Sequence, residues 1–136
     1  MTRVIQERRR AITSALAEKI SGSELEVMKV LWEAGDALPL TDIRTTLQAR
    51  FDWSDPTVKT LLRRLCEKGA VLQEKRRVFY YLPAVSQEAY NDWAAKDLVD
   101  RLFRGSAKNL AAALVRADEL TESDVEELRR MFRGEG

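Results

Sequence analysis

The chain has 136 residues, of which 45% are hydrophobic and 33% are charged, and its formal net charge is only +1. This composition suits one or two small folded domains and excludes a wholly disordered chain. The sequence contains no histidine and one cysteine, Cys66. These counts exclude a disulfide framework, a zinc site of cysteine and histidine, and a histidine-based catalytic triad.

The charge is unevenly distributed along the chain. Residues 1–83 carry 15 basic and 11 acidic side chains, a net of +4, whereas residues 84–136 carry 8 and 11, a net of −3. A basic first part suits a surface that faces phosphate. We expect three parts along the chain: a basic arm over residues 1–20, a first folded domain over 21–83 and a second, acidic region over 84–136.

Two helices are predicted in the first half of the chain. The segment Ser21–Glu24 has the hydroxyl and carboxylate spacing of a capping box, and apolar residues then recur at helical spacing up to Gly35. Leu38–Leu40 is expected to be extended, because Pro39 disfavours helix in the residue before it. Thr41 is then expected to cap a short second helix.

A third helix is predicted from Ser54, a favourable N-cap, to Lys68, with apolar residues along one side. At 100° per residue the opposite side is hydroxylic and basic. Cys66 falls on the inner side and is expected to be a small buried hydrophobe rather than a redox sensor. The candidate DNA-binding residues of this helix are Ser54, Thr57, Lys59, Thr60, Arg63 and Arg64.

These side chains suit a recognition helix in the major groove of double-stranded DNA. Arginine pairs with a guanine edge through two hydrogen bonds, and threonine contacts a thymine methyl group or a phosphate. A solvated charged face is the alternative interpretation of the helix taken alone.

A β-hairpin is predicted after the third helix, with strands at 71–75 and 78–82 and basic residues at the turn. The order helix, short strand, helix, helix, hairpin is that of a winged helix-turn-helix. The wing residues Lys75, Arg76 and Arg77 are therefore candidate contacts to phosphates or a minor groove, although basic turns also protect sheet edges.

Three further helices are predicted after residue 84, and together they form too small a bundle to bury their own apolar stripe. A second copy of the chain would cover it. The fold class expected is mainly α with a small β-hairpin: a winged helix-turn-helix domain followed by a three-helix dimerisation region. The candidate interface residues are Tyr90, Trp93, Leu98, Leu102, Phe103, Leu110, Leu114 and Leu128.

The sequence resembles the penicillinase-repressor family of winged-helix regulators (the BlaI/MecI/CopY type) over about residues 20–132. The resemblance rests on Ile20–Trp32, Trp53–Leu65, Arg77–Tyr81 and Asp118–Leu128. It implies a homodimer with interlocked C-terminal helices and two winged helices on dyad half-sites. It also implies DNA contacts at Ser54, Thr57, Lys59, Thr60, Arg64, Arg76 and Arg77.

Two departures from the family bear on induction. The chain has no C-terminal cysteine cluster, so the copper sensing of some members is not expected. Antibiotic-responsive members are cleaved at an Asn-Phe pair, and the matching place here is Ala113-Leu114, which leaves cleavage by a sensor protease open. The extension before residue 20 is longer than the family leads us to expect.

The sequence therefore predicts a cytoplasmic repressor that binds a palindromic operator as a homodimer. It has no expected catalytic activity, cofactor, metal site or membrane insertion. Release by a small-molecule inducer rather than by proteolysis, and a protein-interaction adaptor using the C-terminal helices, are the alternatives. The sequence does not identify the operator or the regulated genes.

Overall fold

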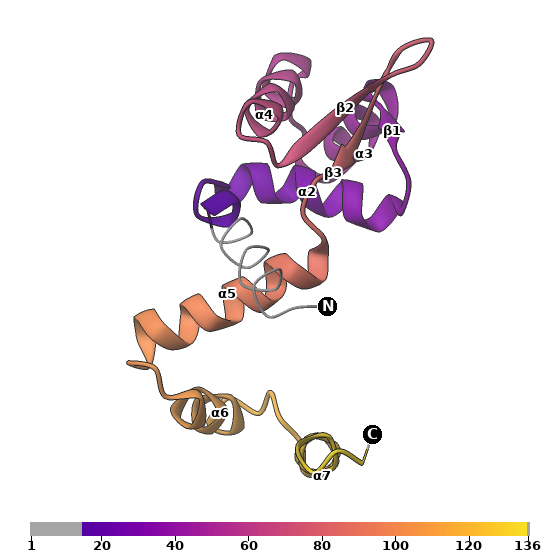
Figure 1. Ribbon diagram of the computed structural model, residues 1–136. Coiled ribbons are helices and arrows are strands. Elements are labelled where there is room, and N and C mark those ends of the chain that lie inside the picture. Colours follow the sequence, from indigo (N-terminus) through magenta and orange to yellow (C-terminus); the bar gives the residue numbers. More distant parts are fainter. Residues whose placement is uncertain (1–14, 136) are drawn as a thin grey trace. The chain divides into compact units, whose positions relative to one another are not determined.

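The computed structural model describes residues 15–135, so most of the predicted basic arm lies outside the described residues. The chain divides into two compact units, Met1–Ala94 and Ala95–Gly136. Among its described residues, the first unit holds the helices α2, α3 and α4, a three-stranded sheet and the start of α5 (Figure 1). Its elements, in order, are α2 (Gly22–Ala34), β1 (Leu38–Pro39), α3 (Leu40–Phe51), α4 (Asp55–Glu67), β2 (Val71–Lys75) and β3 (Phe79–Pro83).

The predicted helix ends are confirmed at α2 and α4. Ser21 and Glu24 form a capping box, and α2 stops at Gly35, whose φ of 71° lies in the left-handed region that glycine adopts without strain. Ser54 caps α4, with Pro56 in the first turn. Local side-chain chemistry therefore determines where both helices begin.

The predicted cap at Thr41 is wrong. Helix α3 begins at Leu40, and its N-cap is Pro39, two residues before Thr41; Pro39 makes no side-chain cap hydrogen bond. The reason is strand pairing: Leu38 and Pro39 form β1, which pairs antiparallel with Tyr81 and Tyr80 of β3. The extended segment is thus held by the sheet, and the helix follows it directly.

The sheet has the strand order β1-β3-β2, so the predicted hairpin gains a third strand. Strands β2 and β3 pair antiparallel from Val71 opposite Pro83 to Lys75 opposite Phe79. Val78, which was expected in the second strand, lies in the turn. The prediction of a mainly helical winged helix-turn-helix is confirmed.

One apolar core joins α2, α3, α4 and the base of the sheet. Met28, Leu31, Ile43, Leu47 and Leu65 have the largest fully buried apolar side chains in it. The indole N–H of Trp32 adds a polar link by donating to the carbonyl oxygen of Val85, at 2.8 Å. Because the core side chains are almost all apolar, the helices are held together chiefly by burial of their apolar sides.

A buried carboxylate links the start of α2 to the end of α4. Glu24 is only 1% exposed, and the ammonium group of Lys68 donates to its two oxygens at 2.5 and 2.8 Å. The same ammonium group donates to the carbonyl oxygen of Lys19 at 2.6 Å. Burial alone would raise the pKa of Glu24, but the hydrogen bonds from Lys68 and Ser21 and the charge of Lys68 outweigh it and lower that pKa.

The remaining helices are α5 (Gln87–Leu102), which begins in the first unit and ends in the second, α6 (Ala107–Arg116) and α7 (Glu122–Phe132). Ser106 caps α6, and Thr121 and Asp124 form a capping box at α7. None of the residues in these three helices is fully buried. Within the described part of the chain, the apolar side chains of these helices are therefore at most half-buried.

Replacing Glu24 with glutamine should lower the free energy of unfolding at pH 7 by about 1–3 kcal/mol, because the Lys68 ammonium group loses a buried ionic partner. The folded pKa of Glu24 lies below its ordinary value of 4.5. Its contribution is therefore complete above that value and is lost as pH falls through the folded pKa. Urea unfolding of both proteins between pH 7 and pH 3 measures this difference.

The control is Glu26→Gln, which removes a carboxylate of the same helix whose partner is the exposed Lys29. It should change stability by less than about 1 kcal/mol. Equal stability of Glu24→Gln and wild type across this pH range would contradict the assigned role of Glu24.

Candidate nucleic-acid interface

The orientation of α4 follows from its buried side. Val58, Leu61, Leu62 and Leu65 are at most 7% exposed, and they fill one side of the helix. The opposite side faces solvent with hydroxyl and basic groups. Of the predicted DNA-binding residues, Ser54, Thr57, Lys59, Arg63 and Arg64 are exposed and Thr60 is half-buried.

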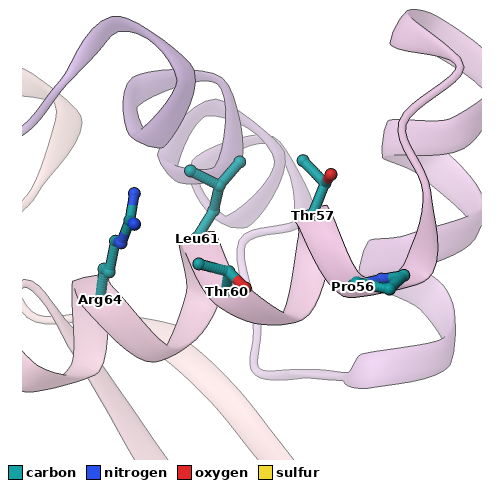
Figure 2. A pocket seen from close by; sticks show the side chains of 5 residues that line it. All are labelled: Pro56, Thr57, Thr60, Leu61 and Arg64. Carbon is teal, nitrogen blue, oxygen red and sulfur yellow. The ribbon is translucent and has the colours of Figure 1, made fainter.

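A shallow depression lies along α4 where its exposed side meets its buried side. It is lined by Pro56, Thr57, Thr60, Leu61 and Arg64. Figure 2 shows Thr57, Leu61 and Arg64 pointing to the same side of the helix. The lining combines an arginine with hydroxyl, methyl and proline ring groups, and these chemical types read base edges and thymine methyl groups.

The hydroxyl groups at the start of α4 are already used within the chain. The Ser54 hydroxyl oxygen accepts the backbone N–H of Thr57 at 3.3 Å, and the two hydroxyl groups lie 3.0 Å apart. Further along the helix, Arg63 pairs with Glu67 at 2.8 Å, with both side chains 61% exposed. An exposed pair of this kind is weak, so Arg63 can exchange Glu67 for another anion at small cost.

The wing places three basic residues at the β2–β3 turn, which extends beyond the helices (Figure 1). The Arg76 guanidinium lies 4.3 Å from the ring centroid of Tyr80. It also donates a hydrogen bond to the Glu74 carboxylate at 3.1 Å, and this hydrogen bond raises the pKa of Arg76. The Lys75 ammonium lies 4.6 Å from the ring centroid of Phe79. All three basic side chains, Lys75, Arg76 and Arg77, are exposed. Aromatic rings thus hold two of the cations at the hairpin tip.

The structure also assigns partners to Asp55, which the sequence analysis did not select. Gln48 of α3 donates its side-chain N–H to Asp55 Oδ1 at 2.7 Å, and Arg44 Nη1 lies 3.7 Å from Asp55 Oδ2. The only sequence signal was an acidic residue in the first turn of a helix, which is common at helix starts. The tertiary contact between α3 and α4 gives it a defined geometry.

Cys66 is half-buried rather than fully buried as expected. It packs against the core from the side of α4. Burial, and to a smaller extent the negative charge of Glu67, raises the pKa of its thiol. A raised pKa lowers the thiolate fraction, so this environment does not favour thiol reactivity.

The predicted interface residues lie along the C-terminal helices. In α5, Tyr90 packs within the chain, with its ring 5.6 Å from Trp32 and 5.8 Å from Trp93. In the second unit the large apolar side chains lie at the surface. Leu98, Phe103, Leu110 and Leu114 are half-buried, and Leu102, Leu128, Met131 and Phe132 are exposed.

Within residues 15–135, no cluster of three or more histidine, cysteine or acidic side chains has the arrangement of a metal site. In that same part of the chain, no helix has the length and apolar character required to span a membrane.

Residues 20–133 match the profile of the penicillinase repressor family. The penicillinase repressor of Bacillus licheniformis is 31% identical over 115 residues, which cover 84% of this chain and 89% of that protein. The methicillin resistance regulatory protein MecI of Staphylococcus aureus is 29% identical over 115 residues, covering 84% of this chain and 93% of MecI.

Among solved structures, the monomeric form of Bacillus licheniformis BlaI in complex with the blaP half-operator is similar to part of this chain. It aligns with a TM-score of 0.48 and 38% identity, covering 53% of this chain and 88% of that one. The family profile spans the described helices and the sheet from residue 20 onward. The chain therefore belongs to the penicillinase repressor family.

Proposed function

We propose that this protein is a DNA-binding transcriptional repressor that binds a palindromic operator as a homodimer. The observation that carries the proposal is the exposed hydroxyl and basic side of α4 beside a basic wing. It is supported by two relatives, one named a penicillinase repressor and the other a methicillin resistance regulatory protein. Such relatives give no reason to assign an enzymatic activity. A repressor of this kind would act in the cytoplasm, where bacterial DNA is located.

Helix α4 has the properties that recognition of a major groove requires. Its apolar side is committed to the core, so its outer side can approach base edges without unfolding the domain. Arg64 and Thr57 are exposed and line the depression at the edge of this side. We assign sequence choice to Thr57, Thr60, Arg63 and Arg64, and phosphate contact to Ser54 and Lys59.

The wing supplies further cationic groups at the hairpin tip. Lys75 and Arg76 stand over aromatic rings of β3, which limits the loss of side-chain freedom on binding. We assign Lys75, Arg76 and Arg77 to the DNA backbone, where contacts add affinity without reading sequence.

Dimerisation through the C-terminal helices would cover the apolar residues left at the surface of the second unit. Phe132 is 95% exposed, Met131 65% and Leu102 63%. A set of large apolar side chains without a core marks an interaction surface, and a two-fold dimer would match the symmetry of a palindromic operator.

The function is tested by a mobility-shift titration with the DNA upstream of the protein's own gene, in the presence of random competitor DNA. Tight, competitor-resistant binding to a dyad sequence is expected. Arg64→Ala should weaken operator binding by about 1–3 kcal/mol, because a base-reading arginine is lost, and should change binding to random DNA much less.

The charge-matched control is Lys29→Ala on α2, where the ammonium group already pairs with Glu26 at 3.1 Å. It should leave the ratio of operator to random binding unchanged. A ratio that is also unchanged in Arg64→Ala would contradict the base-reading role of Arg64, and weak binding that the competitor removes would contradict the repressor itself.

Leu128→Asp should shift the protein from dimer to monomer at low micromolar concentration, because it places a charge in the proposed apolar interface. Sedimentation velocity measures the shift. Leu72→Asp is the control, since Leu72 of β2 is 51% exposed and Leu128 is 49% exposed. Dimers that persist in Leu128→Asp, or that are lost equally in Leu72→Asp, would exclude α7 as the interface.

A further inference from the structure

Asp55 places a carboxylate at the leading end of the surface that we propose binds DNA. It is the first residue of α4, and it heads a row that continues with Lys59 and Arg63, because residues four apart lie one above the other on a helix. A carboxylate is repelled by the phosphate backbone, so electrostatic attraction to DNA in general does not account for an acidic residue at this position.

Capping does not explain it either. Ser54 is the N-cap of α4, and its hydroxyl oxygen accepts the backbone N–H of Thr57. The positive end of the helix dipole favours an acidic residue in the first turn only weakly at an exposed position. That preference would be satisfied by a mobile side chain and does not require contacts with another helix.

The Asp55 carboxylate is instead held from one side by α3. Gln48 donates to Oδ1 at 2.7 Å, and the Arg44 guanidinium lies 3.7 Å from Oδ2. The side chain of Asp55 nevertheless remains 51% exposed. A carboxylate can accept about four hydrogen bonds, so Asp55 can still accept hydrogen bonds from groups on the solvent side. Gln48 and Arg44 set the orientation of the carboxylate, and Arg44 partly offsets its charge.

An oriented acceptor at this position distinguishes bases. In the major groove, cytosine and adenine present an exocyclic amino group, whereas guanine and thymine present carbonyl oxygen acceptors that repel a carboxylate. The first residues of a recognition helix are those that contact base edges in helix-turn-helix proteins. Asp55 thus combines the position, the orientation and the chemistry of an amino-group reader.

We propose that Asp55 is a specificity-determining residue that accepts a hydrogen bond from the exocyclic amino group of one cytosine or adenine in each operator half-site. Gln48 and Arg44 are its positioning residues. This inference rests on the proposed function, since it concerns how the same surface chooses its operator.

The test is selection of binding sites from a randomised dyad library by the full-length wild type and by Asp55→Asn. Wild type should prefer cytosine or adenine at one position of each half-site by roughly 5- to 150-fold, and the enriched base shows which of the two is read. The asparagine variant should lose most of this preference, because its amide group also donates.

Asp42→Asn is the matched control, since Asp42 is an exposed acidic residue in the first turn of α3. It removes the same charge from a different helix and should leave the base frequencies unchanged. A second measurement leaves the protein unaltered: a half-site whose preferred base lacks its amino group (pyrimidin-2-one for cytosine, purine for adenine) should bind wild type more weakly by a similar factor.

Identical base frequencies for wild type and Asp55→Asn would overturn this assignment while leaving the repressor intact. Full affinity for the half-site without the amino group would do the same, even if the variant failed to fold. A wild-type protein that enriches no dyad would overturn the proposed function, and this inference with it.

Discussion

The packing of one side of α4 determines the rest of the proposed DNA-binding surface. Val58, Leu61, Leu62 and Leu65 fill the core against α2 and α3, and each buried leucine contributes roughly 1.5–3 kcal/mol. Rotating the helix would expose these residues and bury arginines, and an unpaired buried charge costs more than a buried leucine contributes. Packing of the core therefore determines which side of α4 faces solvent. None of the basic residues on that side takes part in the core.

Much of the first unit could be predicted from local patterns. The caps at Ser21 and Ser54, the stop at Gly35 and the inward side of α4 all depend on residues within one or two helical turns of each other. The pairing of β1 with β3, which displaced the expected cap at Thr41, joins residues about forty positions apart. No local pattern specifies such a contact, because its formation depends on the whole fold.

In the candidate site, too, only the features that follow from local sequence patterns could be predicted. The exposed residues of α4 and the basic wing could be found from periodicity and from the turn, since both follow from which side is apolar. The roles of Gln48 and Arg44 could not, because their contacts with Asp55 require α3 and α4 to be packed. In the C-terminal helices the apolar stripes were predictable from periodicity. The contact of Tyr90 with Trp32 of α2 was not, because it joins residues far apart in the sequence.

The measurement that tests the central claim most directly is the affinity of the wild-type protein for its selected dyad and for random DNA across a series of salt concentrations. Binding through α4 and the wing predicts that the logarithm of both affinities falls linearly with the logarithm of salt concentration, because cationic side chains displace counterions from phosphates. It also predicts that the dyad stays the tighter site throughout, because base contacts are less affected by salt. Affinities that do not change with salt, or that are equal for the two DNAs, would contradict the account.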